Sequence, residues 1–279
     1  MKRWLWLLSA LAGLGLLIAV LMQLPPRPLP IAITQAPDLD HEHQIFDQLL
    51  QDIVSEGMVD YAALRARRDI LHTYLRQLAD SDLPAERDQH LALLLNAYNA
   101  FTLALVDEQL PNNPDRWANW SIQYAFRGLT RVWYAHSFTL AGEQVTLDAL
   151  EHQRIRSFDE PRIHFAVNCA SMGCPPLYEH AFTGDTLEAQ LATVSHRFAN
   201  DPRQLRMDSD GQLRVNAVAL WFGDDFRQHG GVGNFLSTYV EDEALRQHLR
   251  KGQQLHPLPY SWKLNYYRLT ASQPIQTPP

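Results

Sequence analysis

The chain has 279 residues, of which 46% are hydrophobic, so it is long enough to bury the core of one large domain or two small ones. Its formal net charge of -7 argues against non-specific binding of nucleic acid, which usually needs a basic face. The 12 histidines are scattered, and no spacing is typical of a metal site. We therefore expect no nucleic-acid partner, no bound metal and no cofactor.

The charge and hydrophobicity of the first 24 residues predict a membrane anchor. Met1-Lys2-Arg3 is positively charged, and residues 4–24 form an apolar run in which only Ser9 and Gln23 are polar. The run matches a membrane-spanning helix of about 20 residues and exceeds the roughly 7–15 apolar residues of a cleaved signal peptide. Since positive flanks stay in the cytoplasm, we expect a single-pass protein of the bacterial inner membrane with its domain in the periplasm. Secretion to the periplasm after signal cleavage is the alternative.

Three further parts follow this segment. The proline-rich residues 25–38 predict a stiff linker that lifts the domain off the bilayer. Residues 39–270 are expected to form one domain, and residues 271–279 a flexible tail.

The spacing of apolar residues predicts a helix-rich domain. Helices are expected over 43–55, 61–79 (as one helix or two), 85–110, 147–156, 186–200, 232–240 and 243–250, with another beginning at Trp221. The helix over 85–110 is the longest and is apolar nearly all round from Leu91, which places it in the core. Hairpins are expected over 132–146, turning at Ala141-Gly142, and over 204–215. Together these elements predict an α/β fold of the α+β type, a single mixed domain with a small central sheet.

The stretch over residues 161–177 indicates where chemistry could be presented. An apolar, partly β-branched run predicts a buried strand from Arg162 to Asn168. A loop rich in Ser, Gly, Cys and Pro follows, and it holds both cysteines of the protein, Cys169 and Cys174. A loop at the end of a buried element is a common place for functional residues.

The two cysteines allow several interpretations. Cys169 could be a nucleophile, which requires a stabilised thiolate, and Asn168 and Ser171 could then supply hydrogen-bond donors to an oxyanion. A Cys169–Cys174 disulfide is the structural alternative, and an oxidising compartment favours it. Thiol–disulfide exchange is a weaker option, because the two cysteines lack the usual C-x-x-C spacing.

The base for such a nucleophile stays open. On a straight strand, His164 and Cys169 would point to opposite faces and lie about 16 Å apart, beyond hydrogen-bond reach. Glu151 and His152 are adjacent on the helix over 147–156, so their side chains diverge by about 100° and only one of them can readily face the loop. Sequence order does not choose among these residues.

Two amides interrupt the apolar helix over 85–110. Asn96 and Asn99 are three residues apart and therefore share a face. Since a buried amide without a partner costs about 1–3 kcal/mol, we expect them to fasten a neighbouring loop. If that loop carries Cys169, they support the site.

Several segments together resemble the family called domain of unknown function 547. They are Asn96-Ala-Tyr-Asn-Ala100, Thr146-Leu-Asp-Ala-Leu-Glu-His152 with Arg156, residues 161–176, Trp221 to Phe226, and Tyr260-Ser-Trp-Lys-Leu-Asn265. The chain departs from the family pattern at Leu93-Leu-Leu95 and Ser261-Trp-Lys-Leu-Asn265, where we expect changes in packing. The resemblance implies a single mixed α/β domain and a thiol centre that uses Cys169, His164 and Glu151.

Two functional hypotheses follow from the sequence. The first is a cysteine-dependent hydrolase or acyltransferase acting on a peptide or amide bond, with Cys169 as nucleophile and Asn96 and Asn99 as supporting donors. Its base would be His164 or His152, oriented by Glu151. The second is a non-catalytic binding domain in which Cys169–Cys174 is a structural disulfide.

Overall fold

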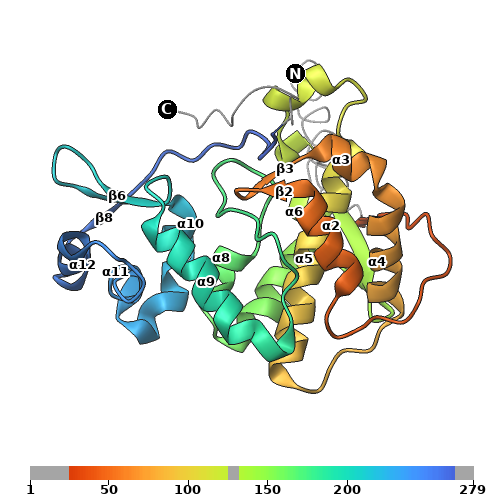
Figure 1. The fold of residues 1–279 in the computed structure, drawn as a ribbon, viewed down its shortest axis with the longest axis horizontal. Coiled ribbons are helices and arrows are strands. Elements are labelled where there is room, and N and C mark those ends of the chain that lie inside the picture. Colours follow the sequence, from red (N-terminus) through yellow and green to blue (C-terminus); the bar gives the residue numbers. More distant parts are fainter. Residues whose placement is uncertain (1–24, 125–131, 268–279) are drawn as a thin grey trace, which may run out of the picture.

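The computed structural model describes residues 25–124 and 132–267, and helices make up most of the fold (Figure 1). The expected anchor over residues 1–24 and the tail over 271–279 lie outside the described residues. Within the described ranges, no helix has the length and hydrophobicity needed to cross a membrane.

The centre of the fold is the long helix α5 (Arg87–Gln109). It begins where the Glu86 carboxylate accepts hydrogen bonds from the backbone N–H groups of Asp88 and Gln89, and it ends before Pro111. Every residue from Leu91 to Asp107 is buried. The sequence predicted this all-round burial, and α5 is the platform on which the other elements pack.

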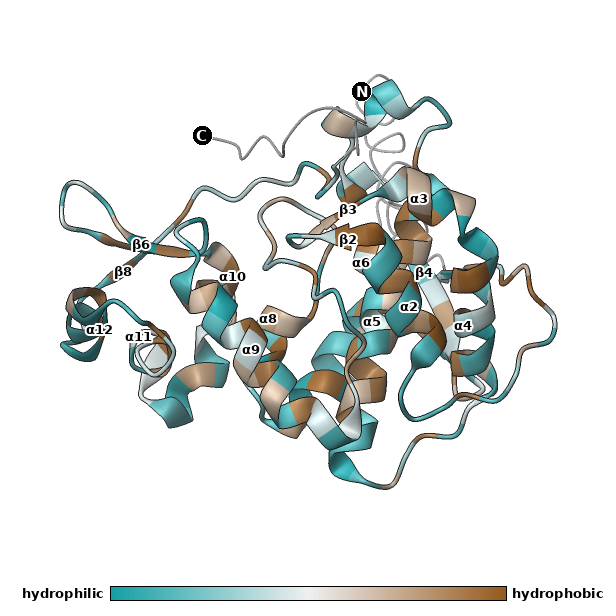
Figure 2. Ribbon diagram, in the orientation of Figure 1, coloured by the Kyte–Doolittle hydropathy of each residue, from teal (hydrophilic) through white to brown (hydrophobic). Residues whose placement is uncertain are grey.

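Three helices cover one side of α5, namely α2 (Gln44–Ile53), α3 (Tyr61–Ala66) and α4 (Arg68–Asp80). The buried face of α2 repeats every three or four residues, and its Phe46 ring stacks on Tyr74 of α4 at a centroid distance of 4.6 Å. Figure 2 shows hydrophobic and hydrophilic residues on the same helices, as expected for helices with one face in the core.

Helices and turns of the second half complete the fold. The turns before residue 125 are η1 (Pro114–Asn119) and η2 (Ile122–Tyr124). The elements after residue 131 are α6 (Val132–Ala135), α7 (Leu147–Ala149), η3 (Leu150–Arg154), η4 (Ile155–Phe158), α8 (Ile163–Ala166), η5 (Gly184–Thr186), α9 (Leu187–Asn200), α10 (Ala217–Trp221), η6 (Gly223–His229), α11 (Gly231–Leu236) and α12 (Glu243–Arg250). In Figure 1 the C-terminal elements α11 and α12 lie on the opposite side of α5 from α4.

The strands of the described residues form three small sheets. One joins β1 (Arg27–Pro28), β4 (His136–Leu140) and β5 (Glu143–Val145), and a second pairs β2 (Val54–Ser55) with β3 (Met58–Val59). The third joins β6 (Leu205–Met207), β7 (Leu213–Val215) and β8 (Leu255–Pro257). The helix-rich α+β class and both hairpins are confirmed, except that Val132–Ala135 form the helix α6 and the first strand begins only at His136. The prediction of a single central sheet is wrong, because the strands are short and form three separate sheets.

Part of the expected linker packs on the domain. Arg27 and Pro28 pair in parallel with His136 and Ser137 of β4, and the Leu29 N–H donates to the Ser137 carbonyl at 2.8 Å. Residues 25–38 are therefore not a free spacer over their whole length.

The prediction of a strand from Arg162 to Asn168 is wrong. Ile163–Ala166 instead form one helical turn, α8, and all four residues are buried. Pro161 suits a helix start, the Glu160 carboxylate accepts a hydrogen bond from the Arg162 N–H, and Phe165 stacks on Phe198 of α9 at 4.1 Å. A short run that is buried all round has no helical or strand periodicity, so the sequence pattern cannot distinguish the two.

Candidate functional site

The loop that carries the cysteines is fixed by buried amides. Asn99 of α5 donates from Nδ2 to the Ala166 carbonyl at 3.0 Å, and its Oδ1 accepts the Asn168 N–H at 2.9 Å. Asn168 in turn donates from Nδ2 to the Pro175 carbonyl and accepts from the Ala170 N–H and from Asn265 Nδ2. The start of the loop is thereby attached to the core helix, as the sequence predicted for Asn99.

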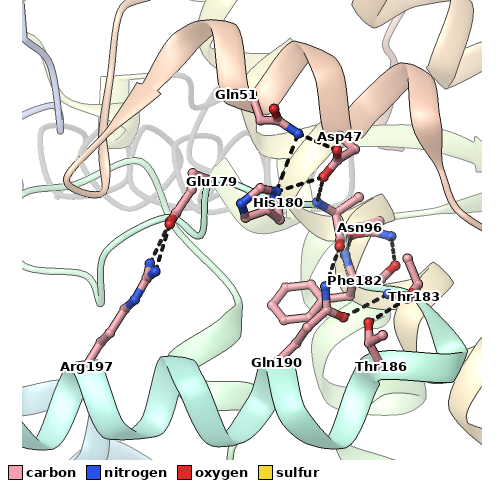
Figure 3. A network of polar contacts seen from close by, with 11 residues as sticks. Asp47, Gln51, Asn96, Glu179, His180, Phe182, Thr183, Thr186, Gln190 and Arg197 are labelled. Atoms are coloured by element: carbon pink, nitrogen blue, oxygen red, sulfur yellow. Dashed lines mark hydrogen bonds and ion pairs between the residues drawn. The ribbon is translucent and has the colours of Figure 1, made fainter.

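Asn96 fastens a different segment, which follows the cysteine loop. Its Oδ1 accepts the Phe182 N–H at 2.8 Å, and its Nδ2 donates to the Phe182 carbonyl at 2.7 Å (Figure 3). Gln190 of α9 holds the same segment by donating to the Ala181 carbonyl and accepting from the Thr183 N–H. The two amides of α5 therefore hold both sides of the loop.

Cys169 and Cys174 form a disulfide, and the protein has no other cysteine. The Tyr260 hydroxyl lies 3.0 Å from Cys169 Sγ and 2.7 Å from Ser171 Oγ. Burial raises the pKa of Tyr260 to about 12, so this hydroxyl is protonated at neutral pH. Ser171 thus contacts Tyr260 and lies against the disulfide, and it does not face open space.

The chain after β8 closes over the loop at Gly173. The Gly173 N–H donates to the Ser261 carbonyl, and a β-carbon on Gly173 would lie 2.8 Å from Ser261 N and 2.8 Å from Tyr260 Cδ2. Only glycine allows the backbone to approach so closely without displacement. The segment around Tyr260 is therefore fixed against the cysteine loop.

A cavity of about 300 Å³ opens beside the disulfide. All four residues named as catalytic candidates from the sequence line it: Cys169 and His164 from residues 161–177, and Glu151 and His152 from η3. Asn96, Asn99, Asn168 and Ser171 do not line it and act as supports. The helical turn of α8 is what brings His164 to the cavity, so the 16 Å estimate for a straight strand does not apply.

His164 is oriented by a carboxylate that the sequence analysis did not name. Its Nε2 lies 2.8 Å from Asp225 Oδ2, and Arg156 holds the same carboxylate through two hydrogen bonds of 2.6 and 2.7 Å. The hydrogen bonds from Arg156 lower the pKa of Asp225, so it is ionised and accepts the proton of His164 Nε2. Burial lowers the pKa of His164 to about 4, against the opposing effect of Asp225. At neutral pH His164 is therefore neutral, with the lone pair on Nδ1.

Glu151 and His152 both line the cavity, although only one of these adjacent residues was expected to face the cysteine loop. They lie in η3, a wider helical turn of a kind that often occurs at functional sites. Glu151 is only 8% exposed, and it accepts a hydrogen bond from the Tyr98 hydroxyl, which itself accepts one from Trp133. Burial raises the pKa of Glu151. His152 is exposed, 3.0 Å from Arg156 Nη1 and 3.5 Å from Asp148 Oδ1.

Aromatic rings from three segments complete the cavity wall. They belong to α6, to α10 with the residue that follows it, and to the chain after β8: Trp133, Tyr134, Trp221, Phe222, Tyr260 and Trp262. Sequence reasoning assigned none of these rings to the site, nor Arg156 and Asp225. The available signal was the set of segments resembling the unknown-function family, which contains Arg156, Trp221 to Phe226 and Tyr260 to Trp262.

Residues 83–199 match the family model described as "Protein of unknown function, DUF547". Over these residues the chain is similar to the DUF547 family. The matched segment includes α5, the helical turn with Glu151, and the cysteine loop. Trp221, Tyr260 and Trp262, which complete the cavity, and Asp225, which holds His164, lie beyond it. No curated protein and no solved structure matches the chain.

Proposed function

We propose that this protein is a binding domain in which the Cys169–Cys174 disulfide is a structural staple beside the ligand cavity. The observation that carries the proposal is the disulfide, which joins the only two cysteine sulfur atoms of the chain. A nucleophilic cysteine needs a thiolate, and neither sulfur is a thiol while the bridge is intact.

The surroundings of the disulfide suit a preformed binding site. Asn99, Asn168, Gly173 and Tyr260 fix the cysteine loop against α5 and the chain after β8. A cavity wall that is held in this way loses little conformational entropy when a ligand binds. The volume of about 300 Å³ is at the small end of the range for small-molecule pockets, roughly 300–1,000 Å³. A small ligand is therefore the natural occupant.

Counting thiols tests the proposal. The protein is purified from an oxidising compartment, denatured without reductant, treated with an alkylating reagent and weighed intact by mass spectrometry. We expect no alkylated cysteine before reduction and two afterwards. Two alkylated cysteines before reduction would exclude the staple and return the catalytic hypothesis to first place.

A second candidate is the cysteine-dependent hydrolase or acyltransferase with a peptide or amide substrate. The observation that favours it is that His164, held by Asp225, lines the same cavity as Cys169. A dithiol reductant would first have to transfer two electrons and two protons to the disulfide, giving two thiols here and a disulfide in the reductant. The test is amide hydrolysis by the reduced protein, which Cys169→Ala should abolish and Cys174→Ala should retain.

We also propose that residues 1–24 anchor the protein in the bacterial inner membrane, with the domain in the periplasm. The support is the apolar run after a positive N-terminus, together with a disulfide, which persists in oxidising compartments. Fractionation of cells tests the proposal. We expect the protein to be recovered with the membranes. We also expect protease added to spheroplasts to digest the domain. A protein of lower mass, in the soluble periplasmic fraction, would indicate signal cleavage instead.

A further inference from the structure

Two of the aromatic residues that line the cavity beside the disulfide are exposed. Trp221 is 56% exposed and Tyr134 is 48% exposed, although both are large apolar side chains that usually lie mostly inside a protein. The ring of Trp221 lies 4.8 Å from Tyr260 and 6.3 Å from Trp262, in an almost parallel arrangement with the latter. Exposed aromatic clusters of this kind often mark ligand sites.

The charge at the cavity is acidic. Asp148 and Glu151 line it, and within residues 25–124 and 132–267 no lysine or arginine does. The side chain of Asp148 is 17% exposed and lies 3.5 Å from His152, while Glu151 forms no salt bridge with any residue that the structure describes. A buried carboxylate without a cation is unfavourable when it is ionised.

The nearest arginine does not fill this role. Arg156 lies over the Phe222 ring at 5.3 Å, but its guanidinium is engaged by the two oxygens of Asp225. The remaining basic groups at the cavity are His152 and His164, and burial keeps His164 neutral at pH 7. His152 and Arg156 lie near Glu151, but no residue that the structure describes forms a salt bridge with its carboxylate.

We infer that the cavity binds an organic cation, an alkylammonium group held by the faces of Trp221, Tyr260 and Trp262 with Glu151 as its counter-ion. Aromatic faces attract ammonium groups through the ring quadrupole, and tryptophan is the strongest of the three aromatic types. The inference rests on the proposed binding function and specifies its ligand class. A neutral ligand such as a sugar would use the rings and could donate hydrogen bonds to the carboxylate, but it would leave the negative charge of the carboxylate unbalanced.

Binding of choline and of its uncharged isostere, in which carbon replaces the nitrogen, tests the inference on the full-length protein. The two probes have the same shape and differ in charge, so isothermal calorimetry at pH 7.5 isolates the effect of the cation. We expect choline to bind at least about tenfold more tightly than the isostere. Equal affinity, or no binding of choline, would overturn the cation assignment.

Two pairs of variants locate the binding. Trp221→Ala and Glu151→Gln should each weaken choline binding by at least about tenfold, because one removes a ring face and the other removes the counter-ion. Their matched controls are Tyr124→Ala, an aromatic residue that is 62% exposed and outside the cavity, and Glu143→Gln on β5, whose carboxylate is exposed. The controls should bind like the wild type, and choline affinity unchanged in Trp221→Ala would place the cation elsewhere.

The outcomes also separate this inference from the proposed function. The thiol count could show an intact disulfide while choline and its isostere bind equally well. That combination would support the stapled binding domain and reject the cation as its ligand. Two free thiols would reject the staple whatever the calorimetry shows.

Discussion

Asn99 binds both ends of the short extended segment that leads from α8 to the disulfide. Its side chain donates to the carbonyl of Ala166 and accepts from the N–H of Asn168, at 3.0 and 2.9 Å. Asn99 is 3% exposed, so both hydrogen bonds are shielded from water. One amide on the core helix thus positions the residue that precedes Cys169.

Replacing Asn99 with alanine should destabilise the protein substantially. The change leaves the Ala166 carbonyl and the Asn168 N–H buried without partners, and each unsatisfied group costs about 1–3 kcal/mol. We expect a loss of about 2–4 kcal/mol in the free energy of unfolding, measured by urea denaturation. Gln48→Ala, at an exposed position of α2, is the control and should change stability by less than about 0.5 kcal/mol.

If Cys169–Cys174 is a staple, both cysteines should contribute equally to stability. A bridge across so short a loop restricts the unfolded chain by about 2 kcal/mol in the chain-entropy model. We therefore expect a similar loss in the free energy of unfolding, measured in urea without reductant, for Cys169→Ala, Cys174→Ala and the double variant. Reductant should lower the stability of the wild type and leave the double variant unchanged. A loss confined to one cysteine would contradict the staple.

The close approach at Gly173 gives a further prediction. An added methyl group would meet the backbone nitrogen of Ser261 at 2.8 Å, and backbone cannot move away as easily as a flexible side chain. Gly173→Ala should therefore lower the free energy of unfolding by about 1–3 kcal/mol, as overpacking does in other proteins. Gly223→Ala is the matched control, because its nearest neighbour is Val232 Cγ2 at 4.0 Å. Equal stability of the two variants in urea would contradict the close contact.

The sequence was sufficient for elements whose pattern is long or whose turn is distinctive. The apolar run from Leu91 onward fits only a helix buried on all sides, and α5 has this form. The hairpin of β4 and β5 turns at Ala141-Gly142, where both residues have positive φ, as the sequence indicated. The strand predicted over Arg162–Asn168 failed because a four-residue buried run carries no periodicity.

The site was predictable only in part, because its contacts join distant segments. Glu151, His164 and Cys169 were chosen from local motifs, and the structure places all three at one cavity. The partnership of His164 with Asp225 spans 61 residues, and no local pattern encodes it. Such pairings depend on how α8 and η6 pack, which sequence order alone does not determine.

Burial of His164 should make the protein less stable in acid. Its pKa is lowered from the ordinary 6.5 to about 4 in the folded protein, so the unfolded chain takes up the proton first. The stability that the folded protein has while His164 is neutral is fully present above pH 6.5 and is lost as the pH falls towards 4. The difference in pKa corresponds to a loss on the order of 3 kcal/mol.

Unfolding free energies of the wild type and His164→Gln across this pH range measure that contribution. The variant should lose about 3 kcal/mol less than the wild type between pH 7 and pH 4. His41→Gln, at an exposed position, should follow the wild-type curve. Parallel curves for wild type and His164→Gln would show that His164 is not the group responsible.

Glu151 should have the opposite effect on the pH dependence. Burial raises the pKa of this carboxyl above its value in the unfolded chain, so its contribution to stability is present at low pH and declines as the pH rises through the folded pKa. Glu151→Gln keeps an oxygen that can accept the hydrogen bond from Tyr98 and removes the ionisation. We therefore expect Glu151→Gln to melt at a higher temperature than the wild type near pH 8 and at a similar temperature near pH 4.

Choline should raise the melting temperature of the wild type near pH 8 but not that of the variant, because only the wild type supplies a carboxylate. A variant less stable than the wild type at both pH values would contradict the assignment of Glu151 as a buried acid that forms no salt bridge with the residues the structure describes.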